Sequence, residues 1–287
     1  IVVDLGKLGV KHGEECVVAV MADNSDDKTY PPGKPQYALD FCYHGGIYRD
    51  VWLIAKNDVF ITDPSVENRR DAGIFVHYGE ISEQRAEVFV EVNVRNGSAR
   101  PRRLMVENAG KTVDRASQAL ILSPGTQSVS QRMVVKRPRL WSPETPYLYK
   151  VVTSVKEGRL TLDGGTTRIG IRSIEFRGCE GFWLNGKRYR QLIGANRHQD
   201  FAYVGNAVPN SQQWRRLKCC GFNIIRTAHY PQDPSFMDAC DELGLFVIVA
   251  TPGWQFWNKT DSGFEARVLQ NTREIIRRDR NHPSVLM

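Results

Sequence analysis

No apolar run in this chain approaches the roughly 18 residues that a membrane-spanning helix needs, so we expect no membrane partner. The sequence has no Cys-x-x-Cys pair and no cysteine at metal-binding spacing from a histidine, so a structural zinc site is not expected. No Gly-x-Gly-x-x-Gly follows the first strand of the α/β part, which weighs against a dinucleotide fold. We therefore expect neither a metal nor a cofactor.

A secretory leader and an initiator methionine are also missing. The chain opens on Ile-Val-Val-Asp-Leu-Gly, which has the character of a strand, so we expect an internal part of a longer protein. Of the 6 cysteines, Cys220 and Cys240 fall on apolar faces of predicted helices, which predicts buried free thiols. Cysteine usage leaves the compartment open, and a periplasmic or extracellular location is favoured over a cytoplasmic one.

The excess of positive charge is not gathered in one place. The net charge is +7, but the basic residues are scattered over 69–70, 100–103 and 277–280, with acidic residues among several of these clusters. Nucleic-acid-binding domains concentrate basic residues on one face. We interpret the charge as solvated surface and expect no nucleic-acid partner.

The chain is long enough for two or three domains, and its first part reads as incomplete. With 287 residues, 41% of them hydrophobic, it can bury more than one core. Residues 1–58 hold two strand-like runs, 15–22 and 50–55, around a long segment rich in Pro, Gly, Asp and Tyr. So few strands cannot bury a sheet face alone, so we interpret 1–58 as the C-terminal part of a larger all-β domain.

The middle part, residues 59–176, predicts an antiparallel β-sandwich. Run 86–96 alternates apolar and polar residues, and runs 126–137 and 147–157 continue the pattern. Turn residues interrupt the runs at about ten-residue intervals, which is typical of an immunoglobulin-like sandwich. A Pro-rich bend at 139–149 carries Trp141, which we interpret as structural.

The last part, residues 177–287, alternates strands with helices. Strands are predicted at 187–196, 222–228, 245–250 and 284–287. Helices are predicted between them, at 210–221, 233–244 and 264–281. The second helix has Asp233 as N-cap, Pro234 at its first position and Gly244 past its end. Such alternation predicts parallel βα units, here the N-terminal half of a (β/α)8 barrel.

Polar and aromatic side chains follow three of these strands, and a (β/α)8 barrel builds its active site at such strand ends. Imidazole and guanidinium groups can hydrogen-bond sugar hydroxyls, and indoles can stack on the C–H faces of a sugar ring. We therefore predict a carbohydrate-binding site formed by His198, Asp200, Arg226, His229 and Trp254. Trp254 and a further candidate, Trp257, are its weaker members, and the alternative is that one of the two belongs to the core. The alternatives are that His198 caps a loop and that Arg226 pairs with a carboxylate for stability alone.

The sequence at these strand ends resembles glycoside hydrolase family 2, which contains β-galactosidases, β-glucuronidases and β-mannosidases. Residues 223–248 resemble the family's first signature, and 181–200 resemble its entry into the barrel. Residues 140–149 and 169–176 resemble its sandwich domain, and 40–53 resemble the end of its jelly-roll sugar-binding domain.

The resemblance implies a multidomain β plus α/β protein. Its parts would be the tail of a jelly-roll sugar-binding domain (1–58), an immunoglobulin-like β-sandwich (59–176) and the first half of a (β/α)8 catalytic barrel (177–287).

The resemblance also implies a mechanism. Family members are retaining hydrolases that use a pair of glutamates, one as acid/base and one as nucleophile, in a double displacement. Residues 279–287 resemble the start of the family's second signature, so both glutamates are expected beyond the C-terminal end, and this chain alone is expected to be inactive. By resemblance, Arg226 would bind the nucleophile, His198 and His229 would contact sugar hydroxyls, and Trp254 would form a sugar platform.

Specificity and assembly remain open at this point. Segments 40–53 and 196–200 favour a β-galactosidase. A β-glucuronidase, another specificity of the family, or a non-catalytic carbohydrate-binding protein on the same fold stays possible. Ala250 and Thr251 stand where many members have acidic residues, which puts any metal or polar contact from that position in doubt.

A half barrel would expose a strand edge, so we predict a homo-oligomer that associates through 245–287.

Overall fold

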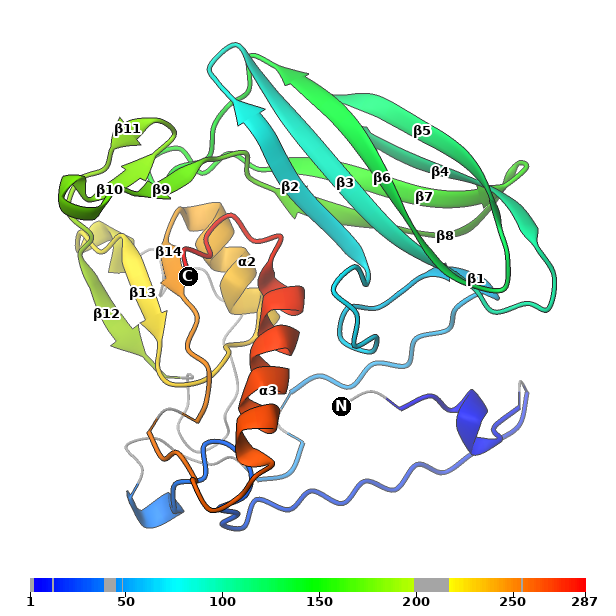
Figure 1. Cartoon of the computed structure of the whole chain (residues 1–287), viewed down its shortest axis with the longest axis horizontal. Coiled ribbons are helices and arrows are strands. Elements are labelled where there is room, and N and C mark those ends of the chain that lie inside the picture. Colours follow the sequence, from blue (N-terminus) through cyan, green and yellow to red (C-terminus); the bar gives the residue numbers. More distant parts are fainter. Residues whose placement is uncertain (1–2, 12, 39–44, 48, 199–216, 254) are drawn as a thin grey trace.

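The computed structural model describes residues 3–11, 13–38, 45–47, 49–198, 217–253 and 255–287. An N-terminal segment leads into a sandwich of two antiparallel sheets, which is followed by a parallel sheet with helices (Figure 1). In Figure 1 the sandwich lies at the upper right, and strands β12 to β14 lie at the left with helices α2 and α3 beside them.

The sandwich consists of two four-stranded sheets. In one sheet the order is β1-β3-β2, and β6 pairs with the other edge of β3. Its strands are β1 (Val59–Ile61), β2 (Ile74–Ile81), β3 (Arg85–Asn96) and β6 (Gly125–Lys136). The second sheet has the order β5-β4-β7-β8. Its strands are β4 (Arg102–Gly110), β5 (Val113–Leu122), β7 (Tyr149–Glu157) and β8 (Leu160–Ile169).

Period-2 patterning forms the sandwich core as predicted. In β3 the side chains of Val88, Val90 and Val92 are fully buried, while Phe89 and Glu91 between them are partly exposed. They belong to one cluster with Val106 of β4 and Val151 of β7, so the inner faces of the two sheets share a core. The predicted immunoglobulin-like sandwich is confirmed in its strands and in its core.

A small meander connects the sandwich to the parallel sheet. It contains β9 (Ile174–Phe176), β10 (Phe182–Leu184) and β11 (Lys187–Arg188). Asn185 and Gly186 join β10 to β11, both with positive φ, as the two-residue turn of a hairpin requires. The single strand predicted over 187–196 is therefore wrong, because its first two residues pair antiparallel with β10 and only its end joins the parallel sheet.

The parallel sheet has the order β12-β13-β14, with β12 (Gly194–Arg197), β13 (Ile224–Thr227) and β14 (Phe246–Ile248). Beside β14 the chain starts a fourth parallel strand, because Val285 bridges Val247 and the amide of Leu286 donates to the carbonyl of Val247 at 2.8 Å. This is the start of a (β/α)8 barrel, as expected from the alternation of elements.

Helix α2 (Pro234–Leu243) begins and ends where its capping residues predict. Asp233 accepts a hydrogen bond from the amide of Ser235 at 2.9 Å, and Gly244 takes a left-handed conformation at the other end. Cys240 is buried as expected, and so are Phe236 and Ala239. Met237 and Asp241 are buried too, because α2 is covered on a second side by the sandwich and by the fourth strand.

Helix α3 (Phe264–Asp279) is attached to the sandwich at its C-terminal end. Arg277 is only 8% exposed, and its Nε donates to the carbonyl of Pro64 at 3.0 Å. Arg280 donates to the carbonyls of Arg70 and Ala72. The interpretation of 277–280 as solvated charge is therefore wrong, since these guanidinium groups satisfy backbone carbonyls of the sandwich.

Trp141 lies at the junction of sandwich and barrel, and its structural interpretation agrees with its surroundings. Its side chain is fully buried, its Nε1 donates to the carbonyl of Asp241 at 2.9 Å, and its ring packs edge-on against Phe246. A side chain at Gly170 would collide with Trp141 and Pro283, so the sandwich approaches the barrel with its backbone there.

Two further expectations are wrong in the described residues. Runs 15–22 and 50–55 form no strand, because none of the described strands lies beside them to complete a hydrogen-bonded ladder, and their apolar side chains are exposed. Cys220 is exposed, whereas Cys240 is buried, and burial raises the pKa of its thiol. The exact domain boundaries at 58/59 and 176/177 stay predictions.

Candidate active site

The inner face of the parallel sheet is layered, and the layering places Arg226. Gly194, Ile224 and Phe246 are neighbours in register across the three strands. Two residues further along each strand, the neighbours are Asn196, Arg226 and Ile248. Neighbours in a parallel sheet, and residues two apart along a strand, point to the same face. The layer of Ile224 and Phe246 is closed from below by Trp141 and Phe182. The layer above it, which contains the polar side chains of Asn196 and Arg226, therefore lies at the C-terminal ends of the strands.

The opposite face is anchored by α2, which fixes the orientation of the strands. Ile225 and Val247 are buried in a cluster with Phe236, Met237 and Cys240 of α2. Because side chains alternate along a strand, burial of Ile225 against the helix turns Arg226 toward the inside of the barrel.

Arg226, His229 and Asn196 form a hydrogen-bonded group at the strand ends. Nη1 of Arg226 lies 3.1 Å from Nδ1 of His229 and 3.4 Å from Oδ1 of Asn196. A guanidinium group can only donate, so Nδ1 of His229 accepts in this contact and the ring proton resides on Nε2. The Nε2–H group is then a donor suited to a hydroxyl oxygen.

His198 completes the group from the end of the first strand. Its ring lies 5.7 Å from that of His229, edge to face, and 6.1 Å from that of Tyr230. The structure thus brings together His198, Arg226 and His229, as the strand-end argument predicts. Asp200 and Trp254 lie outside the described residues. Trp257 is 46% exposed and packs edge-on against Phe264.

Two further residues of this group, Asn196 and Tyr230, are not among the predicted site residues. Asn196 is the last residue of the strand predicted over 187–196, but only the register with β13 shows that it faces Arg226. Tyr230 follows His229 directly, and the signal that could have found it is that adjacency. The Ala228–His229 peptide bond is cis.

One group of side chains in the described residues lies close enough to share a cation: Asp238, Asp241 and His282. Asp241 Oδ2 lies 2.6 Å from Nδ1 of His282, its Oδ1 accepts from the amide of Ser284, and Asp238 pairs with Arg168. These contacts account for all three side chains as structural partners, so we assign no metal to them.

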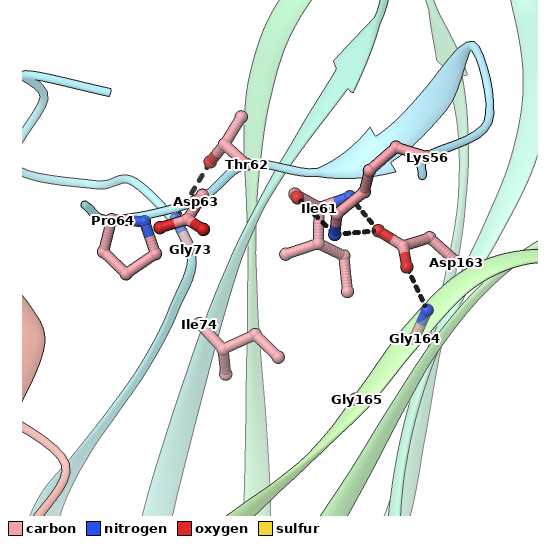
Figure 2. A pocket seen from close by; sticks show the side chains of 10 residues that line it. All are labelled: Lys56, Ile61, Thr62, Asp63, Pro64, Gly73, Ile74, Asp163, Gly164 and Gly165. Atoms are coloured by element: carbon pink, nitrogen blue, oxygen red, sulfur yellow. Dashed lines mark hydrogen bonds and ion pairs between the residues drawn. The ribbon is translucent and has the colours of Figure 1, made fainter. Parts of the chain in front are cut away.

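A hollow of about 230 Å³ lies on the sandwich, between β1, β8 and the loop before β2 (Figure 2). Asp163 accepts from Nζ of Lys56 at 2.9 Å and from the amide of Ile61 at 2.8 Å. The hollow contains none of the strand-end residues, and its ion pair fastens the segment before β1 to β8. We therefore place the candidate site at the strand ends.

No helix in the described part of the chain has the length and apolar character to cross a membrane.

Two family descriptions match most of the chain. Residues 72–172 match "Glycosyl hydrolases family 2", and residues 174–287 match "Glycosyl hydrolases family 2, TIM barrel domain". A β-galactosidase of Thermoanaerobacter pseudethanolicus is 33% identical over 97% of this chain. A β-glucuronidase of Bacteroides fragilis is 31% identical over 96% of it.

Solved structures agree with this result. Bacteroides uniformis β-glucuronidase 2, covalently bound to cyclophellitol-6-carboxylate aziridine, superposes with a TM-score of 0.79 at 32% identity, covering 92% of this chain and 32% of that one. The chain spans 36% of the β-galactosidase and 41% of the B. fragilis β-glucuronidase named above. With both of its larger parts matched and a relative 33% identical over almost its whole length, the chain belongs to glycoside hydrolase family 2.

Proposed function

We propose that the protein containing this chain is a retaining exo-β-glycosidase, and that His198, Arg226 and His229 form part of its sugar site. The observation that carries the proposal is the Arg226–His229 contact of 3.1 Å, above an apolar layer closed by Trp141 and Phe182. Such a floor excludes water from below, while the polar groups face the open end where a glycoside would enter.

Each side chain has a stated role in the proposal. His229, with its proton on Nε2, donates to a sugar hydroxyl, and His198 contacts the same ring. These bonds strengthen as the sugar gains oxocarbenium character. Arg226 holds the nucleophilic glutamate ionised, because a nearby cation favours the charged carboxylate. Asp200 and Trp254 are proposed as further contacts to the sugar.

The pair of catalytic glutamates completes the mechanism. One protonates the leaving oxygen, and the other attacks the anomeric carbon to form a glycosyl-enzyme that water releases. We propose that both follow Met287 in a longer protein, so that the 287 residues alone do not turn over substrate.

For the sugar we propose a β-galactoside, with a β-glucuronide as the second candidate. The support is divided, because the β-galactosidase of T. pseudethanolicus and the β-glucuronidase of B. fragilis match at 33% and 31% identity. Homo-oligomerisation through 245–287 also stays a proposal. Phe246 and Val247 in that region are already buried within the chain.

Hydrolysis of nitrophenyl β-galactoside, β-glucuronide and β-mannoside, measured on the longer protein and on the 287 residues side by side, tests this proposal. We expect the longer protein to cleave the galactoside fastest and the 287 residues to cleave none. Turnover by the 287 residues alone would show that the catalytic groups lie within them. Sugar binding without hydrolysis by either would favour a carbohydrate-binding protein.

A further inference from the structure

An arginine from the N-terminal segment reaches the loop that carries His229. Nη2 of Arg49 donates to the carbonyl oxygen of Pro231 at 3.0 Å, across 182 positions of sequence. Pro231 lies in the connection 228–233 between β13 and α2, two residues after His229. Arg49 is half-buried, and its guanidinium group supplies a charged donor to a neutral carbonyl, which is a strong hydrogen bond in a partly dry setting.

The same connection is held at other points by the barrel itself. Nη1 of Arg197, at the end of β12, donates to Oε1 of Gln232 at 2.5 Å, and Gln232 is 1% exposed. Arg226 holds the ring of His229 from the strand below, and Asp233 closes the connection as the N-cap of α2. Arg49 therefore adds an attachment from outside the barrel, between His229 and Gln232.

Other contacts also attach the N-terminal segment to the barrel, so Arg49 is not its sole anchor. Nδ2 of Asn258 donates to the carbonyl of Lys28 at 2.8 Å, and Nε of Arg267 donates to the carbonyl of Thr29 at 2.7 Å. Gly33 lies so close to Phe264 that an added Cβ would stand 3.0 Å from the ring. These contacts involve the β14–α3 connection and α3, and they leave 228–233 untouched.

We propose that Arg49 is a positioning residue for His229. It acts through the carbonyl of Pro231, holding the connection 228–233 so that the imidazole keeps its contact with Arg226 and presents Nε2 to the substrate. The effect of Arg49 on catalysis rests on the proposed function, in which His229 contacts the sugar. The N-terminal segment then contributes to the site without contacting the sugar through this residue.

Three variants separate this role from simple attachment. Arg49→Met keeps the side-chain stem and removes the donor, while Arg49→Lys keeps one charged donor. The matched control is Asn258→Asp, which loses the Nδ2 donor to Lys28 but keeps the Oδ1 acceptor used by the amide and hydroxyl of Thr260. The control thus removes one hydrogen bond between the same segment and the barrel, away from His229.

Amide hydrogen exchange on the 287-residue chain gives a readout that does not need activity. We expect Arg49→Met to speed exchange at Ala228 and Ser235, whose amides donate to the carbonyl of Arg197 and to Oδ1 of Asp233 at the two ends of the connection, by about tenfold, the size expected for losing one charge-assisted hydrogen bond. Arg49→Lys should restore part of the protection, and Asn258→Asp should leave these amides unchanged. Unchanged exchange in Arg49→Met, or an equal effect in the control, would overturn the proposal.

Kinetics of the longer protein supply the second readout. We expect Arg49→Met to lower kcat/KM by about tenfold or more, mainly through kcat, because contacts made by a displaced His229 weaken most in the transition state. Wild-type kinetics in Arg49→Met would refute the positioning role. If the wild-type protein hydrolyses no glycoside, the proposed function fails instead. The exchange data and the His229 imidazole NMR shifts then decide whether Arg49 positions His229.

Discussion

Asp241 is a carboxylate buried within an otherwise apolar face of α2, and its contacts explain why it is there. It is 1% exposed. Its two carboxylate oxygens bind the ring of His282 and the amide of Ser284, and its backbone carbonyl accepts from Trp141. One residue therefore joins the helix, the approach to the fourth strand and the sandwich. An unpaired carboxylate at this position would be strongly destabilising, because a buried charge needs a partner.

The Asp241–His282 pair predicts how stability depends on pH. Burial lowers the pKa of His282, but the hydrogen bond to Asp241 and the negative charges of Asp241, Asp279 and Asp238 together outweigh burial, so its pKa lies above the ordinary value of 6.5. A raised histidine pKa stabilises the fold fully below about pH 6.5, and this stabilisation is lost as pH rises through the raised pKa. We expect urea unfolding to show declining stability above about pH 6.5 in the wild type and a flatter profile in His282→Gln. Parallel profiles for the two proteins would contradict this assignment.

At the scale of elements, α3 connects the barrel to an edge of the sandwich. Strand β2 ends its sheet in the order β1-β3-β2, so one edge of it has no strand partner among the described residues. Asn281, just after α3, takes that place at one point. Its Oδ1 accepts from the amide of Val76 at 2.9 Å, and its Nδ2 donates to the carbonyl of Ile74 at 2.8 Å. A side-chain amide thus substitutes for the backbone of a neighbouring strand.

Removing this amide should weaken the junction between barrel and sandwich. We expect Asn281→Ala to lower the free energy of unfolding by about 2 kcal/mol, because two half-buried backbone groups lose their partner. Asn281→Asp should keep the acceptor for Val76 and lose the donor for Ile74. The control is Arg273→Ala on the exposed side of α3, expected to change stability by less than about 0.5 kcal/mol. Denaturant unfolding measures all three, and equal effects of Asn281→Ala and the control would refute the role.

At the scale of the whole molecule, the sequence predicted what local rules determine. The caps of α2 and the alternation of β3 follow from residues within a few positions of each other, and both are present. Arg226 and His229 could be found because a strand end carries both, three positions apart. The partners Asn196 and Arg49 could not, because register and a contact across 182 positions bring them to the site. The burial of Arg277 is missed for the same reason, since composition does not show which carbonyls a charged helix end will meet.

We have proposed that the group around Arg226 is the sugar site of a family 2 glycosidase. The most direct measurement is kcat/KM of Arg226→Lys in the longer protein, on whichever nitrophenyl β-glycoside the wild type cleaves best. Lysine keeps the charge but loses the Nη1 donor that contacts both His229 and Asn196, so we expect a fall of at least about 100-fold. Arg85→Lys, on the sandwich surface with its side chain 47% exposed, should retain wild-type activity. Wild-type kcat/KM in Arg226→Lys would contradict the account.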